Sequence, residues 1–337
     1  MKEMQKKEKI LSAVFTIYLL CFVFRLFEYF ILRTDQTVLG EALVHKLIGI
    51  AILFISMKLL QFNLREIGYV KERAFKNLLM GLAFGIAVFT IAYAVEILLV
   101  IAQGNFDSLK VYVSTYAVDK NVGRQTAMIF FLICIFGNII NVVMEEGIFR
   151  GIFMTILQKK YSFIVSAIIS AILFGLWHMV GPIRNYFDGI SSMEGTIANI
   201  IMLVVTSGLV GFKFALLTKM TGNLYMGLGD HFVNNTIVNI LHVVSNTGAD
   251  ELMFVRITIA QSISCIFVFI FYIKKGSSPN LVGDRYSYHR FQGGIVVVKQ
   301  RYVKGAVLHF VETLDILLLH NYWVPKESMN IVATPLL

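Results

Sequence analysis

The chain has 337 residues, of which 57% are hydrophobic and only 15% are charged. Soluble domains carry about 25% charged residues, so this chain has too little charge to cover a globular surface. Its four prolines and 25 glycines also exclude a collagen-like or proline-rich chain. The composition predicts a polytopic membrane protein, in which the net charge of +9 reflects basic cytoplasmic loops and not a nucleic-acid partner.

Eight apolar segments follow one another along the chain, each long enough to cross a bilayer at a rise of about 1.5 Å per residue. The first continues directly from a basic start without a small-residue cleavage site, so we expect no cleavable signal peptide. The predicted spans are 10–32, 42–61, 77–102, 126–157, 162–180, 196–218, 223–244 and 252–273. The sequence therefore predicts an all-α membrane bundle of about eight transmembrane helices.

Basic residues in the connections predict the orientation, because cytoplasmic loops are enriched in lysine and arginine. Thirteen lie on one side of the predicted membrane and five on the other, so we expect both termini in the cytoplasm. The first set is Lys2, Lys6, Lys7, Lys9, Arg65, Lys71, Arg73, Lys76, Lys159, Lys160, Lys219, Lys274 and Lys275, and the second is Arg33, Lys110, Lys120, Arg124 and Arg184.

The character of the sequence changes after Lys275. Segment 276–294 has the glycine, serine and proline of a linker, 295–303 predicts a strand, and 306–320 predicts a short amphipathic helix. We therefore expect a membrane domain followed by a small cytoplasmic appendage of unknown role. The expected boundaries are 1–275 for the membrane domain, with a motif core at 76–245, and 276–337 for the appendage.

Three charges interrupt the fourth apolar segment, in the stretch EEGIFR at 145–150. Ionisable groups at membrane depth are costly unless they are paired or face a cavity, so a functional site is the first hypothesis. Glu146 and Arg150 are four residues apart in the acid-first order that favours pairing. The residues leave open whether this pair is a structural clamp or takes part in chemistry.

Glu145 is expected on a different face, because one residue along an α-helix turns the side chain by about 100 degrees. That face also carries Asn141 and Asn138. A carboxylate beside amides, with no cation of its own, keeps lone pairs free and can take a proton from water as a general base. We therefore expect Arg150 to hold Glu146 and leave Glu145 available.

Two later segments supply partners for such a base. FGLWH ends at His178, with Phe174 four residues earlier, and HFVNN places His231 and Asn235 four apart on one face. A lone histidine in an apolar helix is commonly a satisfied core group, and a polar stripe can also join helices in lipid. Both alternatives remain open at this point.

Depth favours a common site. At 1.5 Å per residue, Glu145 and His178 lie about 21–27 Å from the turn at 159–160, and His231 lies about 18 Å from the same side. With ordinary tilts the three side chains meet at one level, at or beyond the membrane midplane.

The same residues suggest two chemistries. Glu145 with His178 can polarise a water, while His231 and Asn235 can donate hydrogen bonds to the oxyanion of a tetrahedral intermediate. Glu145, His178 and His231 would also suit Zn²⁺, which takes three such ligands plus water. The HExxH spacing of the zincins is absent, so metal-dependent and metal-free hydrolysis both stay open.

The three motifs resemble those of the CAAX prenyl protease and bacteriocin-processing (CPBP) family of intramembrane proteases. EEGIFR matches its EExxxR motif, FGLWH its FxxxH and HFVNN its HxxxN, in the family's order and over roughly 76–245. The resemblance implies water activation by Glu145, assistance by His178, an oxyanion site lined by His231 and Asn235, and support from Glu146, Arg150 and Phe174.

The resemblance also implies partners and a compartment. The family is called metalloprotease, with a metal-free glutamate mechanism also argued, and it trims prenylated CAAX proteins or acts in peptide maturation and bacteriocin immunity. We therefore expect a hydrolase in a bacterial plasma membrane, acting on a membrane-associated peptide, a protein C-terminus, or a bacteriocin or pheromone precursor. One departure is Asp230, where relatives often have a small residue; it can orient His231, act as a ligand, or face a neighbouring helix.

Two other classes of function compete with the hydrolase. A membrane scaffold or immunity protein would bind a peptide without cutting it, and would not need four convergent polar groups in lipid. A transporter is disfavoured because the sequence has no internal repeat and no pair of interrupted helices in matching positions.

Overall fold

The structure is a computed structural model that describes residues 2–37, 42–114, 124–276, 286–291 and 294–299. Contacts divide the chain into two units, Met1–Val268 and Phe269–Leu337, and each is described by itself. The helices of the first unit are α1 (Lys2–Phe27), α2 (Val44–Leu59), α3 (Ala74–Ala102), α4 (Met128–Glu145), α5 (Met154–Leu157), α6 (Phe163–Trp177), α7 (Val180–Phe187), α8 (Met193–Thr221) and α9 (Tyr225–Ile240). It also holds the short helices η1 (Glu28–Leu32), η2 (Thr34–Gln36) and η3 (Glu146–Phe153), the strands β1 (Phe106–Val111) and β2 (Leu241–Ser245), and most of α10 (Met253–Gly276).

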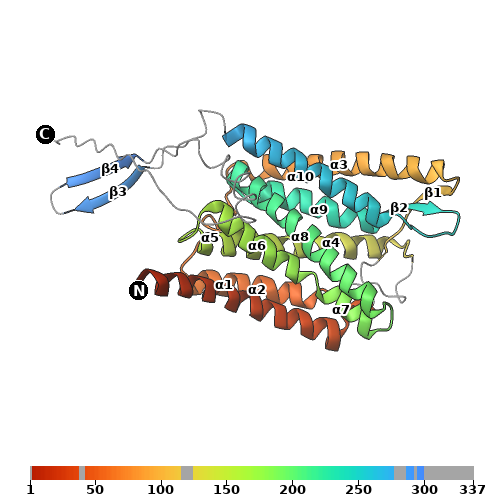
Figure 1. The fold of residues 1–337 in the computed structure, drawn as a ribbon, viewed down its shortest axis with the longest axis horizontal. Coiled ribbons are helices and arrows are strands. Elements are labelled where there is room, and N and C mark those ends of the chain that lie inside the picture. Colours follow the sequence, from red (N-terminus) through yellow and green to blue (C-terminus); the bar gives the residue numbers. More distant parts are fainter. Residues whose placement is uncertain (1, 38–41, 115–123, 277–285, 292–293, 300–337) are drawn as a thin grey trace, which may run out of the picture. The chain divides into compact units, whose positions relative to one another are not determined.

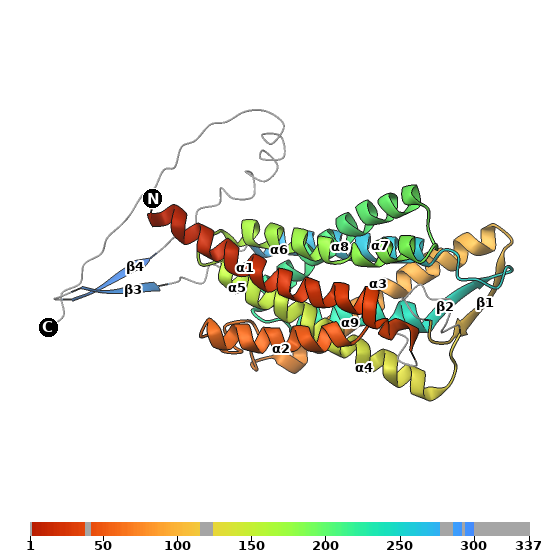
Figure 2. The same ribbon diagram turned by 90° about the horizontal axis from the view of Figure 1, so that it is seen from below.

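The long helices run along a common direction (Figures 1 and 2), and in the described part of the chain six helical stretches are long and apolar enough to cross a membrane. These stretches are Lys9–Leu32, Ala74–Ala102, Met128–Leu157, Phe163–Phe187, Met193–Thr221 and Met253–Lys274. The predicted all-α polytopic membrane bundle is confirmed.

The two remaining predicted spans are shorter than the sequence suggests. Helix α2 has 16 residues and ends where Gln61 adopts a positive φ of 56°. Helix α9 also has 16 residues, because Leu241 turns to an extended conformation and enters β2. Among the described residues, six of the eight predicted spans therefore coincide with helical stretches of spanning length, and α2 and α9 are shorter helices of the same bundle.

A two-stranded antiparallel sheet of segments far apart in the sequence lies at one end of the bundle, and the apolar pattern did not predict it. β1 pairs antiparallel with β2, with Phe106 opposite Ser245 and Val111 opposite Leu241. Figures 1 and 2 place this pair at the end opposite α5. The pairing fixes where α9 ends and therefore how deep its polar residues lie.

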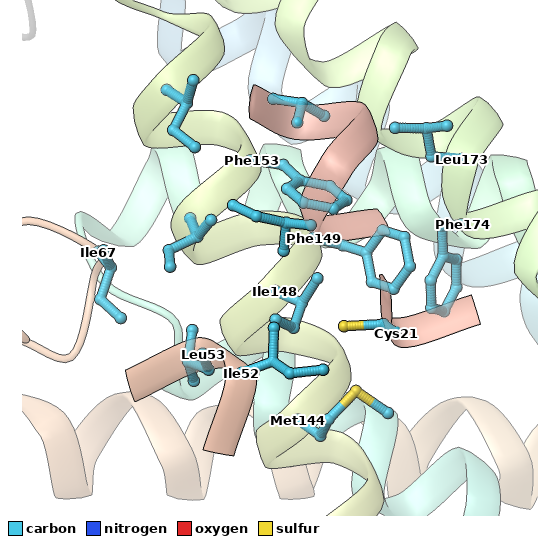
Figure 3. Close-up of a cluster of buried hydrophobic side chains, with 14 of the residues drawn as sticks. Cys21, Ile52, Leu53, Ile67, Met144, Ile148, Phe149, Phe153, Leu173 and Phe174 are labelled. Atoms are coloured by element: carbon cyan, nitrogen blue, oxygen red, sulfur yellow. The ribbon is translucent and has the colours of Figure 1, made fainter. Parts of the chain in front are cut away.

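Apolar side chains cover the outside as well as the interior. Ile31, Leu98 and Phe136 expose 67%, 66% and 60% of their surface, which suits a lipid environment that soluble proteins lack. Inside, Phe149 and Phe153 of η3 pack in one cluster with Cys21 of α1 and Phe174 of α6 (Figure 3). This cluster packs around the helix that carries the EExxxR motif.

Helices α3 and α9 approach so closely that glycines are required at their crossing. A Cβ at Gly229 would lie 2.5 Å from the Leu78 carbonyl oxygen, and one at Gly81 would lie 2.2 Å from the Met226 carbonyl oxygen. Small residues let membrane helices pack backbone to backbone in this way. The contact fixes the helix on which His231 lies two residues later.

We expect Gly229→Ala to destabilise the bundle by about 1–3 kcal/mol, because the new methyl group must push two backbones apart. The thermal unfolding temperature in detergent should fall. Gly181→Ala is the matched control, since a Cβ at Gly181 meets nothing within 4 Å. Equal stability of the two variants would contradict the close helix crossing.

The second unit contains a hairpin of β3 (Tyr286–Phe291) and β4 (Gly294–Lys299). The strands pair antiparallel, with Tyr286 opposite Lys299 and Phe291 opposite Gly294. The strand predicted at 295–303 overlaps β4, whereas β3 lies in the segment predicted as a linker. The helix predicted at 306–320 lies outside the described residues.

Candidate active site

The two adjacent glutamates lie where the helix changes its winding. Glu145 is the last residue of α4, and Glu146 is the first of η3, which is π-helical through Phe153. Such wider turns inside α-helices occur frequently at functional sites. Both glutamates are buried, at 3% and 0% exposure. A regular α-helix would point the two side chains to different faces and so toward different partners. In the structure both carboxylates approach His231 instead.

His231 of α9 lies between the two carboxylates. Its Nδ1 is 2.9 Å from Glu146 Oε1, and its Nε2 is 3.5 Å from Glu145 Oε2. The ring stacks on Phe214 of α8, with the centroids 4.8 Å apart. A neutral imidazole has one N–H and donates to one partner, whereas a protonated ring donates to both. The arrangement can therefore hold a proton at His231 or exchange it with Glu145.

Glu145 is less free than the helix-face argument predicts. Its Oε1 accepts a hydrogen bond from the Trp177 indole at 2.9 Å, and its Oε2 accepts one from Asn141 at 3.4 Å. Asn138, expected on the same face, donates instead to Cys134 at 3.5 Å. Within the described residues no lysine or arginine pairs with Glu145. Neutral donors therefore orient this carboxylate without a salt bridge to a permanent cation.

The predicted pairing of Glu146 with Arg150 is formed. Arg150 Nη1 is 3.3 Å from Glu146 Oε1, and both side chains are almost fully buried. The Arg150 guanidinium also lies 3.9 Å above the Phe174 ring, and its Nε donates to the Gly211 carbonyl at 3.3 Å. Because the same Glu146 oxygen faces His231, this pair fixes the imidazole as well as the helix.

His178 follows the last residue of α6 and joins the site through Phe174. Its Nδ1 donates to the Phe174 carbonyl at 2.8 Å, since a carbonyl can only accept. In the neutral ring this leaves Nε2 as an acceptor. The Phe174 ring lies 4.7 Å from the His178 ring and 6.1 Å from the His231 ring, between the two imidazoles.

Among the described residues, no hydrogen bond or ion pair joins Asn235 to the other predicted site residues. Its Oδ1 accepts a hydrogen bond from Asn234 at 2.9 Å. Asp230 faces a neighbouring helix, where its Oδ2 is 2.8 Å from Lys213 Nζ of α8. Of the alternatives open for Asp230, the structure thus supports interhelical pairing.

Two contributors were missed by the sequence reasoning. Trp177 lies inside the FGLWH motif, and its indole N–H had no assigned role. Lys213 is a lysine within a predicted span, a signal that alone could have flagged it as functional. The partner of each is set by packing between helices and cannot be read from spacing along one helix.

The donor set was also tested against a metal ion. Within the described residues, no group of three histidine, cysteine, aspartate or glutamate side chains is placed to hold one. The side chains in this arrangement therefore do not fit the three-ligand zinc site that the sequence left open.

The fold and the site together define a polytopic membrane protein with a buried acid–imidazole centre. Residues 127–237 match the family model described as type II CAAX prenyl endopeptidase, Rce1-like. This span, about one third of the chain, contains all three motifs, and its similarity to that protease family confirms the resemblance. A comparison with curated proteins found no match.

Proposed function

We propose that this chain is an intramembrane endopeptidase that hydrolyses a peptide bond with a water activated by Glu145. The observation that carries the proposal is the 3.5 Å approach of Glu145 to His231 within a membrane bundle, where both residues are only 3% exposed. A positioned carboxylate next to an imidazole is an arrangement that moves protons in hydrolases. The match of the same segment to a protease family supports this chemistry.

In the proposed reaction Glu145 takes a proton from water as the water oxygen bonds to the scissile carbonyl carbon. The carbonyl π electrons move to its oxygen. That oxyanion accepts hydrogen bonds from the Asn235 amide and from the Nε2–H of protonated His231, whose Nδ1–H stays on Glu146. When the intermediate collapses, the C–N bond breaks and Glu145 returns its proton to the amine nitrogen. His178 contributes Nε2 as an acceptor that orients the water, while Glu146 and Arg150 hold His231 in place.

The buried guanidinium of Arg25 lies on the Trp177 indole, whose N–H bonds to Glu145. A cation at this position supports a substrate that ends in a free carboxylate, such as a protein C-terminus. The Arg25 guanidinium of α1 lies 4.4 Å above the Trp177 ring, whose N–H reaches Glu145. Arg25 Nη1 donates to His45 Nε2 at 3.3 Å, so His45 is a neutral acceptor there. In the described part of the chain Arg25 has no carboxylate partner, and its buried Nε has no hydrogen-bond partner.

A terminal carboxylate would satisfy this cation. The distance from Arg25 across the indole to Glu145 can be bridged by two or three extended residues of about 3.4 Å each. We therefore propose that the bond cut lies a few residues before a free C-terminus. On the basic-loop count, we further propose that both termini lie in the cytoplasm. On the resemblance to the protease family, we propose a bacterial plasma membrane and a lipid-associated or prenylated polypeptide as substrate.

The test compares two peptides that differ only in a free or an amidated C-terminus, using the reconstituted chain in water labelled with heavy oxygen. We expect one heavy oxygen in the new carboxylate and a KM at least about tenfold lower for the free acid, since charge-assisted hydrogen bonds are worth about 1.5–3 kcal/mol. Arg25→Met should remove this preference and Arg25→Lys should keep part of it.

Each outcome of this test is informative. Binding of peptide without label incorporation would favour a scaffold or immunity protein over a hydrolase. Hydrolysis with equal KM for both peptides would leave the endopeptidase proposal intact and contradict the role of Arg25.

A further inference from the structure

A buried lysine stands at the start of a chain of hydrogen bonds that ends at Asn235. Lys213 Nζ of α8 is 2.8 Å from Asp230, 3.0 Å from Gln261 Oε1 and 3.0 Å from Ser264 Oγ of α10. Its side chain is 1% exposed. An ionisable residue inside a membrane segment is by default a candidate functional residue, because its burial is costly. Pairing with Asp230 alone would not require the two further contacts of Lys213 with α10.

The direction of every bond in this chain follows from Lys213. An ammonium can only donate, so the Gln261 amide must present its oxygen to Lys213 and its nitrogen to the other side. Gln261 Nε2 then donates to Asn234 Oδ1 at 2.6 Å, and Asn234 Nδ2 donates to Asn235 Oδ1 at 2.9 Å. None of these amides can flip without placing two donors or two acceptors face to face.

The last amide is the one that matters for chemistry. With its oxygen occupied by Asn234, Asn235 has only its Nδ2 group left to offer, and no hydrogen bond among the described residues uses that group. Asn235 lies one helical turn after His231, on the same face of α9. An oxyanion needs N–H donors, and an asparagine turned the other way would present a carbonyl oxygen and repel it.

We propose that Lys213 is a positioning residue that acts through Gln261 and Asn234 to present the Asn235 amide as a hydrogen-bond donor to the oxyanion. The inference rests on the proposed function, because it assumes that Asn235 faces the reacting carbonyl. The proposal gives Lys213 a role beyond pairing with Asp230. An ammonium at this position determines which end of each of the three following amides donates and which accepts.

The experiment is a double-mutant cycle on the reconstituted 337-residue chain. Gln261→Met interrupts the line of hydrogen bonds, so that the Asn234 amide and then the Asn235 amide can flip. We expect kcat to fall about tenfold with KM changed less than about twofold, which is the pattern of a lost transition-state interaction. Asn235→Ala should lower kcat by about 100-fold, as removal of an oxyanion donor does elsewhere. In the Asn235→Ala background, Gln261→Met should have almost no further effect on kcat.

Ser264→Ala is the matched control, because Ser264 accepts from Lys213 and reaches only the oxygen end of the Gln261 amide, at 3.5 Å, which Lys213 already holds in place. Its kcat should stay within twofold of wild type. Should Gln261→Met not fold, Asn234→Leu interrupts the same line one step later and replaces it in the cycle. Multiplicative losses in the double variant would show that Gln261 acts by another route and would overturn the relay. Absence of hydrolysis by the wild-type chain would instead contradict the proposed function. Failure of the relay and failure of the proposed function therefore give different results.

Discussion

Glu145→Gln is expected to abolish hydrolysis while leaving the protein folded. Glutamine keeps the size of the side chain and can still accept the Trp177 indole hydrogen bond at the position of Oε1. It cannot take a proton from water at neutral pH. Loss of a general base costs about 10²–10⁴ in rate, so kcat measured on a reconstituted peptide substrate should fall by at least about 100-fold.

The control separates chemistry from charge. Glu194 lies in the exposed first turn of α8, and Glu194→Gln removes the same charge without touching the site. We expect full activity and an unchanged unfolding temperature for this variant, and an unchanged unfolding temperature for Glu145→Gln. If Glu145→Gln kept more than a tenth of the wild-type kcat, water activation would have to be assigned to another group.

Much of the site could be predicted from one-dimensional spacing because the helices are long and regular. Apolar runs located the helices, and the interval between Glu146 and Arg150 indicated their pairing. The same reasoning placed His231 at the depth of Glu145, and the structure brings these two side chains to 3.5 Å. Spacing is informative here because rise and turn per residue are nearly constant along a regular helix.

The rest depended on features that no spacing along one helix contains. The π-helical winding after Glu145 lets both glutamates address one imidazole, against the separation assumed for an α-helix. The end of α9 at Ile240 depends on pairing with a strand far away in the sequence. Trp177 lies in an apolar run, and Lys213 is a single charge within a predicted span. The hydrogen-bond partners of both residues lie on other helices.

Arg150→Met is expected to lower the free energy of unfolding by about 3–5 kcal/mol, because removing one partner of a buried pair leaves the other charge uncompensated. Arg150 and Glu146 expose 1% and 0% of their side chains. The abundance of folded protein and its unfolding temperature in detergent should both fall. Glu146→Gln combined with Arg150→Met should recover part of the loss, since no unpaired carboxylate then remains.

A surface pair in the same chain provides the control for that loss. Arg65 and Glu72 are 3.0 Å apart, closer than Arg150 and Glu146, but their side chains are 71% and 60% exposed. Exposed pairs contribute about 0–1 kcal/mol, so Arg65→Met should leave the stability nearly unchanged. Equal effects of the two arginine substitutions would mean that burial does not decide the strength of the Glu146–Arg150 pair. The support of His231 would then have to come from the packing of Phe174 and Phe214 alone.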